Sequence, residues 1–384
     1  MPTTAERSHS TWAIRGQFFA AGALFATWGV QVPTVKAHFG LSEQTLAFAM
    51  LAAGIGSVTG LTQAGRVIGK LGPRSVAFTA GLAAAVAIAL LLATSHYAVL
   101  LVLMFLFGIA ASLFDVAINV AASEIESQAK RPLMSGFHGL FSLGGMAGAG
   151  LGSALQGVGV AAPQHLLLAG VICGVLTIWG CLHMHRGRDA SADGGVVLPR
   201  GVLGLIGALA AVGLLCEGAI YDWSVLYMRE SLQAPAATAA LAYASFSGAM
   251  AATRFAGDWV RARWSSVRLV QVCGALAAIG LGLTLTSSSA FVALVGFALI
   301  GLGLANVVPV LFSAAARVPG VAPADGIAAV AALGYLGMMV GPPLIGMVAE
   351  WQSLSAGLAL VMVFAALLSL AARTALRHDR PSAD

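Results

Sequence analysis

The chain has 384 residues, of which 59% are hydrophobic and only 9% are charged. Soluble globular domains carry about 25% charged residues, so this composition excludes a water-soluble globular protein. The net charge of +5 does not indicate a nucleic-acid partner, because no basic run is longer than Lys130 and Arg131.

Apolar segments recur along the whole chain, and each is long enough to cross a bilayer, which takes about 20 residues in a helix. They are continuous and rich in Ala, Leu and Gly, whereas the strands of a barrel would be short and strictly alternating. The segments lie at 12–35, 43–65, 75–95, 97–122, 134–158, 164–184, 201–228, 236–260, 267–287, 290–315, 325–349 and 353–375. The sequence therefore predicts an all-α membrane protein with twelve transmembrane helices.

The placement of basic residues predicts the orientation of these helices. If both termini are cytoplasmic, all of the 20 Lys and Arg residues except Lys36 and Arg229 fall in cytoplasmic segments. Short cytoplasmic loops carry an excess of Lys and Arg, and an odd number of spans would destroy this pattern. We therefore expect an even number of spans with the N- and C-termini in the cytoplasm.

The two halves of the chain resemble each other. An offset of 193 residues pairs Gly108 with Gly301 and Gly144 with Gly337, and an offset of 192 pairs Gly65 with Gly257. We predict an N-terminal six-helix half over 1–185, a cytoplasmic linker over 186–200 and a C-terminal six-helix half over 201–384. Parallel six-helix halves place a binding site near the middle of the bilayer and work by alternating access.

Several runs of residues resemble a known family. The glycine-led basic loop at 65–74 and its counterpart at 257–263, in a chain of twelve expected helices, resemble the major facilitator superfamily. Four further runs are similar to its YbjJ-type branch of bacterial inner-membrane proteins near the fucose permeases: Asp115–Asn119, His138–Gly144, Asp222–Trp223 and Gly341–Pro343. The resemblance implies the major facilitator fold, a multi-pass location in the bacterial inner membrane and secondary transport, but no substrate.

The glycine-led loops depart from the family pattern, in which an acid stands four residues after the first glycine. Gly69 holds that position in the first half and Arg261 in the second. Asp258 follows Arg254 at a spacing that lets the two side chains pair along one helical face. We therefore predict a gating contact between Arg254 and Asp258, with a solvated pair at a helix end as the alternative.

Asp115 lies well inside the fourth predicted span, where an unpaired charge costs at least a few kcal/mol. Such an acid is protonated, paired or exposed to a water-filled cavity, which are the conditions for a proton-coupling group. Asn119 lies one turn later on the same face and can hold Asp115 or bind a solute. A structural hydrogen bond to a neighbouring helix is the alternative for both residues.

Glu217, near the middle of the seventh predicted span, is the strongest single candidate for proton coupling. The resemblance implies that spans one, four, seven and ten line the cavity, which would place Glu217 across from Asp115. Fucose-permease relatives use acids in spans one and four, but span one carries only Gln17 and Gln31 as candidate polar groups. This departure moves the expected second acid to span seven.

Polar and aromatic residues near the outer ends of two spans suggest a vestibule. Tyr221, Asp222, Trp223 and Tyr227 follow Glu217, and Trp28 and Gln31 lie near the outer end of span one. Aromatic rings there can stack on a solute. The alternative for Trp223 and Tyr227 is an aromatic belt at the membrane interface.

Two more polar residues lie within predicted spans. His138 can relay protons because its ordinary pKa is close to neutrality, or it can simply be hydrated. Asn306, in the middle of span ten, is an amide that binds solute or bridges helices.

The sequence has no nucleotide-binding GxxxxGK[ST] loop, no HExxH motif and no clustered His and Cys for a metal. We therefore expect no cofactor, no metal and no enzymatic activity, and a monomer energised by an ion gradient. The favoured function is proton-coupled transport of a small, polar, neutral solute such as a sugar or related metabolite. The alternatives are proton-driven efflux of a drug or metabolite by antiport, and a membrane sensor that does not transport.

Overall fold

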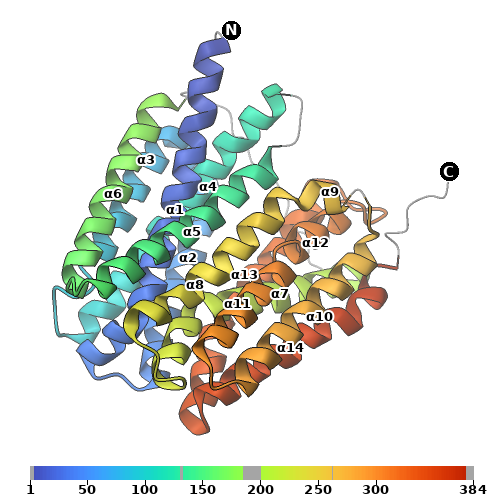
Figure 1. The fold of residues 1–384 in the computed structure, drawn as a ribbon. Coiled ribbons are helices and arrows are strands. Elements are labelled where there is room, and N and C mark those ends of the chain that lie inside the picture. The colour runs from blue at the N-terminus through green and yellow to red at the C-terminus, as the bar shows by residue number, and fades with distance from the viewer. Residues whose placement is uncertain (1–3, 130–132, 185–199, 262, 378–384) are drawn as a thin grey trace. The chain divides into compact units, whose positions relative to one another are not determined.

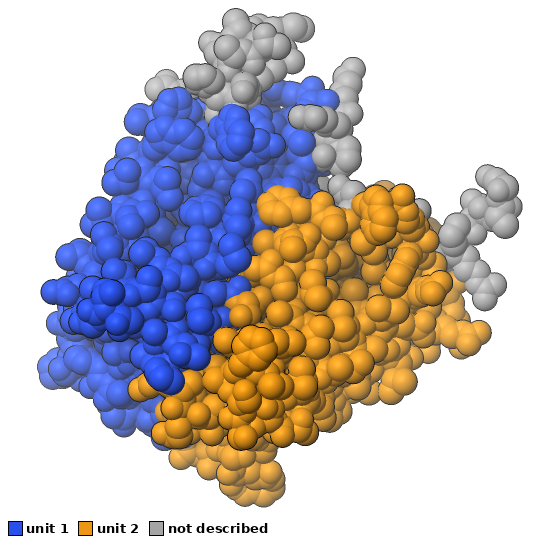
Figure 2. Space-filling view, viewed as in Figure 1, with its two compact units in different colours: residues 1–192, 235–244 blue, residues 193–234, 245–384 orange. Residues whose placement is uncertain are grey.

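The computed structural model describes residues 4–129, 133–184, 200–261 and 263–377. Every regular element in these ranges is a helix (Figure 1). The helices gather into two compact units, residues 1–192 with 235–244 and residues 193–234 with 245–384 (Figure 2). The predicted linker, 186–200, lies outside the described residues except for Arg200.

The helices of the first unit form two groups, one around α1 and one around α4. α1 contacts α5 and α6, while α4 contacts α2 and α3, and α3 also contacts α6. The helices are α1 (Thr4–Phe39), α2 (Glu43–Leu71), α3 (Pro73–Ala89), α4 (Tyr97–Ala129), α5 (Met134–Gly157) and α6 (Ala162–His183).

The second unit repeats this order of pairing. α7 contacts α13 and α14, and α10 contacts α11 and α14. The helices are α7 (Gly201–Glu230), α8 (Ala236–Phe255), α9 (Gly257–Arg261), α10 (Ser266–Thr286), α11 (Ala290–Leu304), α12 (Val307–Ala315), α13 (Pro323–Trp351) and α14 (Leu354–Ala375). The first nine residues of α8 belong to the first unit.

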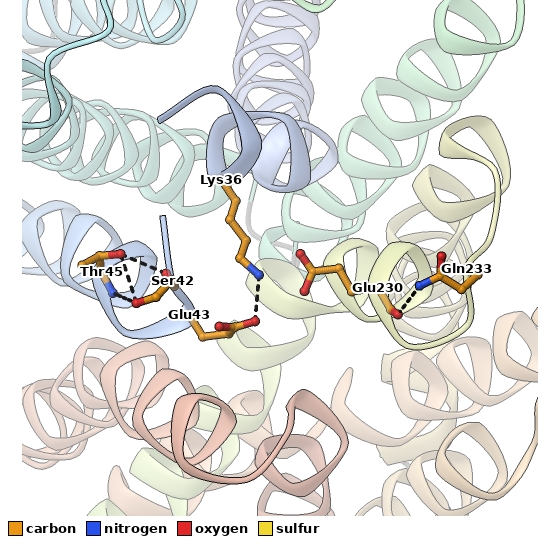
Figure 3. A network of polar contacts seen from close by, with 6 residues as sticks. All are labelled: Lys36, Ser42, Glu43, Thr45, Glu230 and Gln233. Carbon is orange, nitrogen blue, oxygen red and sulfur yellow. Dashed lines mark hydrogen bonds and ion pairs between the residues drawn. The ribbon is translucent and has the colours of Figure 1, made fainter. Parts of the chain in front are cut away.

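Local chemistry fixes the helix ends. Ser42 accepts a hydrogen bond from the backbone N–H of Thr45 and so caps α2 (Figure 3). In the same loop the ammonium of Lys36 lies 2.7 Å from a carboxylate oxygen of Glu43 (Figure 3). Gly40, with φ of +61°, provides the left-handed backbone that ends α1. These contacts join α1 to α2 through a short, well-defined turn.

The internal repeat is visible in helix contacts as well as in sequence. A Cβ added at Gly108 would overlap the carbonyl of Ala53, and one at Gly301 would overlap the carbonyl of Phe246. Both members of the second pair lie 193 residues after those of the first. In the same way, Gly144 of α5 lies against the backbone of α1 and Gly337 of α13 against that of α7. Glycine is required at these places because the backbones of two helices touch.

We expect Gly144→Ala to destabilise the protein by about 1–3 kcal/mol, because the new methyl group must push α1 and α5 apart. The added Cβ would meet the carbonyl oxygen of Phe19. Thermal unfolding of the detergent-solubilised protein measures the effect. Gly150→Ala is the matched control in α5, because nothing lies within 4 Å of a Cβ there. Equal stability of the two variants would contradict this account of the α1–α5 contact.

All twelve predicted spans coincide with helices, but they differ in length and hydropathy. Among the described residues, nine helical segments are long and apolar enough to cross a membrane. They are α1, α2, α4, α6, α7, α10, α11 with α12, α13 and α14. The glycine-rich α5 and the alanine-rich α8 fall outside this group, and α3 has only 17 residues. The count of twelve spans, the cytoplasmic termini and the boundaries of the predicted halves therefore stay predictions.

Candidate functional site

The first unit holds Asp115 and Asn119 on one face of α4. The amide nitrogen of Asn119 donates to the backbone carbonyl of Asp115 at 2.9 Å and to its carboxylate oxygen Oδ1 at 3.1 Å. Both residues are half-buried. This contact is one of the possibilities that the sequence left open for Asn119, and among the described residues Asn119 is the sole hydrogen-bond partner of the Asp115 side chain.

A small cavity opens beside Asp115, inside the first unit. Apart from the acid, every residue around it is apolar, and α1, α3 and α4 all contribute. The lining residues are Ala21, Leu24, Phe25, Ala84, Phe107, Ala111, Phe114 and Asp115. The cavity therefore combines one carboxyl group with walls that cannot form hydrogen bonds through their side chains.

The second unit holds a buried ion pair between α7 and α8. Nη2 of Arg254 lies 3.2 Å from Oε1 of Glu217, and the side chains of Arg254 and Glu217 are only 12% and 9% exposed. A buried charge needs a partner, since removing either member of such a pair costs about 3–5 kcal/mol. The partner of Glu217 is therefore an arginine of its own unit, which sequence analysis had assigned to a gating contact.

The helical span 290–315 is interrupted next to this ion pair. α11 ends at Leu304 and α12 begins at Val307, with Asn306 as the residue before the first turn of α12. A Cβ built on Gly257, three residues after Arg254, would lie 2.9 Å from Oδ1 of Asn306. The start of α12 therefore lies against the chain that carries Arg254.

Contacts with α7 place the same break near Glu217. A Cβ built on Gly213, one turn before Glu217, would lie 3.1 Å from Val307, the first residue of α12. Arg261 of α9 donates a hydrogen bond of 2.5 Å to Ser313 of α12. Asn306 thus lies about one helical turn from Glu217 and from Arg254, where α7, α8, α9 and α12 meet.

The aromatic residues after Glu217 lie deeper than the sequence suggested. Trp223 is fully buried, and Tyr227 is 2% exposed and donates a hydrogen bond to the carbonyl of Thr284. Helices enclose both rings, so neither the interface belt nor the expected stacking on a solute fits Trp223 and Tyr227. Tyr221 is half-buried, packs edge-on against Phe246 and donates to the sulfur of Met250 at 3.5 Å. Asp222 is also half-buried.

Gln31 forms a buried contact that the sequence did not predict. Its amide nitrogen lies 2.7 Å from Nδ1 of His165 on α6, and both residues are 1% exposed. Trp28, one turn earlier, is 4% exposed. The structure therefore places Trp28 and Gln31 in the packed interior, with Gln31 joining α1 to α6.

We expect Gln31→Leu to lower stability by about 1–3 kcal/mol, because His165 would lose its hydrogen bond while staying buried. Thermal unfolding in detergent measures this loss. Gln164→Leu, at the exposed neighbour of His165 in α6, is the matched control and should leave the midpoint unchanged. A Gln31→Leu variant as stable as the control would show that the contact contributes nothing.

Of the two remaining predicted residues, the structure describes the side chain of His138 but not that of Asp258. The ring of His138 on α5 packs edge-on against Phe18, with centroids 5.3 Å apart. The side chain of Asp258 lies outside the described part of the chain, so its contact with Arg254 stays a prediction. No group of three or more His, Cys, Asp or Glu residues in the described ranges is arranged to hold a metal ion.

The Glu217–Arg254 pair could have been sought from the sequence. The predicted span 236–260 contains Arg254, and an arginine within a span requires an acid or a water-filled cavity near it. The sequence analysis counted Arg254 among the cytoplasmic basic residues, so it did not look for an acid beside Arg254 within the membrane. The Gln31–His165 contact had no comparable signal, because two uncharged polar residues 134 positions apart do not reveal a contact.

Comparison with known proteins places the chain in a large family. Residues 15–323 match the sequence profile of the Major Facilitator Superfamily. The chain is 34% identical to an uncharacterized MFS-type transporter of Yersinia pestis, over 94% of each chain. It is 33% identical to an uncharacterized transporter of Sinorhizobium fredii, over 92% of this chain and 95% of that protein.

Solved structures share the fold at low sequence identity. A bacterial homolog of the human lysosomal transporter Spinster, in an inward-facing and occupied conformation, matches all of both chains with a TM-score of 0.79 and 13% identity. A mutant of the nucleoside transporter NupG matches 95% of this chain and 99% of its own with a TM-score of 0.78 and 11% identity. These matches establish the fold of the chain.

Proposed function

Because this chain belongs to the Major Facilitator Superfamily, whose members carry small solutes across membranes, we propose that it is a proton-coupled secondary transporter. The solute is small and polar, a sugar or a related metabolite. The protein works by alternating access as a monomer in the bacterial inner membrane, with both termini in the cytoplasm. Its place in the YbjJ-type branch, near the fucose permeases, is part of the same proposal.

The buried Glu217–Arg254 pair carries this proposal. A carboxylate and a guanidinium inside a membrane protein carry a high free-energy cost, and such charged side chains commonly mark ion or proton pathways. Here the pair lies beside an interrupted helix, a feature that transporters of several folds use to build their binding sites.

In the proposed mechanism, a proton binds to Oε1 of Glu217 and weakens its attraction to Arg254. The guanidinium of Arg254 has five N–H donors, and it then donates hydrogen bonds to the solute. Proton and solute are released together on the other side, and the ion pair forms again. Asp115, held by Asn119, provides the second protonation site in the first unit.

One observation favours efflux as a second candidate. The cavity beside Asp115 is lined by Leu24, Phe25, Phe107 and other apolar side chains. These apolar walls suit an apolar solute better than a sugar, but the cavity must widen to admit one, because it has room for little more than a water molecule. In that case entering protons at Asp115 would drive an apolar drug or metabolite out of the cell by antiport.

Uptake into proteoliposomes tests the proposal. Labelled pools of sugars and related metabolites are supplied with and without an imposed proton gradient. We expect accumulation that needs the gradient, disappears with a protonophore and is lost in Asp115→Asn. Glu124→Gln, at an exposed acid of α4, is the matched control and should transport normally. Full accumulation after collapse of the gradient would contradict proton coupling.

A further inference from the structure

We propose that the second unit binds the headgroup of an anionic phospholipid at the end where α10 begins and α14 ends. The partner is a membrane lipid with a negatively charged phosphodiester, such as phosphatidylglycerol. The inference goes beyond the proposed function, because it depends neither on the solute nor on proton coupling. The binding surface consists of two exposed tryptophans and four exposed arginines, which we call the Trp–Arg surface: Trp259, Trp264, Arg263, Arg268, Arg373 and Arg377.

Each tryptophan of this surface stacks with an arginine four residues later. The guanidinium carbon of Arg263 lies 4.0 Å from the ring centroid of Trp259, and that of Arg268 lies 5.2 Å from the ring centroid of Trp264. These are cation–π contacts. They leave the tryptophans accessible, since Trp259 is 62% and Trp264 is 37% exposed. Exposed indole rings next to the end of an apolar helix suit the headgroup region of a bilayer.

The stacked arginines keep most of their hydrogen-bond donors available. A guanidinium stacks through its flat face, while its five N–H groups point outward in its plane. One nitrogen of Arg263 donates to the backbone carbonyl of Trp259 at 3.0 Å. Among the residues that the structure describes, neither Arg263 nor Arg268 forms an ion pair with an acid. Phosphate oxygens are acceptors that such planar groups bind through two parallel hydrogen bonds.

The packing of α10 against α14 (Figure 1) decides which residues lie at the same level as the stacked pairs. A Cβ built on Gly274 of α10 would lie 2.6 Å from the backbone nitrogen of Ser369 of α14. A Cβ built on Gly282, further along α10, would lie 3.7 Å from the sulfur of Met362, which comes earlier in α14. The two helices are therefore antiparallel, and the first turn of α10 lies level with the last turn of α14.

The end of α14 adds two further positive charges at this level. Arg373 and Arg377 are exposed and lie one helical turn apart, while Arg268 belongs to the first turn of α10. Their long side chains can cover apolar surface while the charged ends reach the lipid headgroups. Between residues 200 and 377, this end of the unit carries two acids, Asp258 and Asp325, fewer than the four arginines of the Trp–Arg surface. The surface is therefore positive, as an anionic headgroup requires.

The opposite end of the same unit has an exposed ring without this positive charge. Trp351, at the end of α13, is 81% exposed. The charged residues at the neighbouring helix ends are Arg229, Glu230 and Glu350, with a negative sum. An indole ring there can lie at the membrane interface, but its surroundings do not attract a phosphate group. Trp351 therefore provides the matched control for the rings of the Trp–Arg surface.

Lipid binding to the purified full-length protein tests the inference. The protein is delipidated in detergent and titrated with phosphatidylglycerol or phosphatidylcholine, and native mass spectrometry gives the dissociation constant of each lipid. Arg66→Gln with Lys70→Gln is the matched control, because it removes two exposed charges from α2, a helix without tryptophan. The two double variants of the Trp–Arg surface remove its arginines in pairs: Arg263→Gln with Arg268→Gln, and Arg373→Gln with Arg377→Gln.

We expect the wild type and the control to prefer phosphatidylglycerol. Each double variant of the Trp–Arg surface should bind it about 25-fold more weakly, since one arginine near an anionic surface contributes a factor of about five. Trp259→Leu should also weaken binding, whereas Trp351→Leu should not. Equal affinity of the wild type for the two lipids would overturn the inference. An equal loss in the control would also overturn it, because it would indicate diffuse attraction to any basic helix end.

Inorganic phosphate distinguishes a lipid site from a site for a free anion. Phosphate added in excess over phosphatidylglycerol should leave the lipid bound, because the free anion makes no contact with the indole rings and the apolar helix surface. Displacement of the lipid by phosphate alone would overturn the assignment to a phospholipid.

Discussion

Replacing Glu217 by Gln is expected to abolish gradient-driven accumulation of solute, down to the level of protein-free liposomes. The amide has nearly the same shape as the acid but cannot take up and release a proton, so solute binding loses its link to the gradient. Counterflow, in which labelled solute exchanges for unlabelled solute without net proton movement, should persist. Paired measurements of accumulation and counterflow in the same proteoliposomes show whether coupling or binding has been lost.

Two comparisons make the Glu217→Gln result specific. Glu124→Gln removes an exposed acid of α4 and should retain both activities. The monodispersity of Glu217→Gln in detergent reports on its folding, because the variant removes one member of a buried ion pair, at a cost of about 3–5 kcal/mol. Normal accumulation by a folded Glu217→Gln protein would remove Glu217 from the coupling mechanism.

Replacing Arg254 by Met is expected to destabilise the protein by about 3–5 kcal/mol, the cost of leaving one member of a buried ion pair without its partner. The remaining Glu217 carboxylate would be only 9% exposed. The midpoint of thermal unfolding in detergent, measured at neutral pH, should therefore fall by several degrees.

The double variant Glu217→Leu with Arg254→Met provides the control. Replacing both members of a buried ion pair by apolar residues of similar volume is often neutral or stabilising. We therefore expect the double variant to unfold near the wild-type temperature while failing to accumulate solute. If it were as unstable as Arg254→Met alone, packing of the arginine stem rather than its charge would explain the loss.

The fold was largely predictable because membrane insertion imposes strong constraints on sequence. Every backbone group in lipid must be paired internally, so long apolar segments become helices and their limits can be read with small errors. The repeat was equally readable: the offset that pairs Gly108 with Gly301 also relates the carbonyls they contact, those of Ala53 and Phe246. The sequence analysis did not predict the break in span ten. The break falls at Ala305 and Asn306, and neither residue is a glycine or a proline.

The candidate site was predictable in its members but not in their pairing. Sequence analysis selected Asp115, Asn119, Glu217, Arg254 and Asn306 because polar groups in apolar helices are costly. It named a contact between Asp115 and Asn119, which are one helical turn apart, as one possibility, and the structure has this contact. It missed the pair of Glu217 and Arg254, since residues 37 positions apart meet only through the packing of α7 against α8. Local spacing reveals contacts within a helix, whereas contacts between helices need the fold.

The pH change outside lightly buffered proteoliposomes, on addition of solute pools that include sugars and sugar acids, tests the central claim most directly. Wild-type protein should take up protons with the solute, so the external pH rises, and Glu217→Gln should give no signal with the same pool. A fall in external pH would instead indicate antiport and favour efflux. A signal of equal size in wild type and Glu217→Gln would contradict the claim that the Glu217–Arg254 pair couples proton and solute.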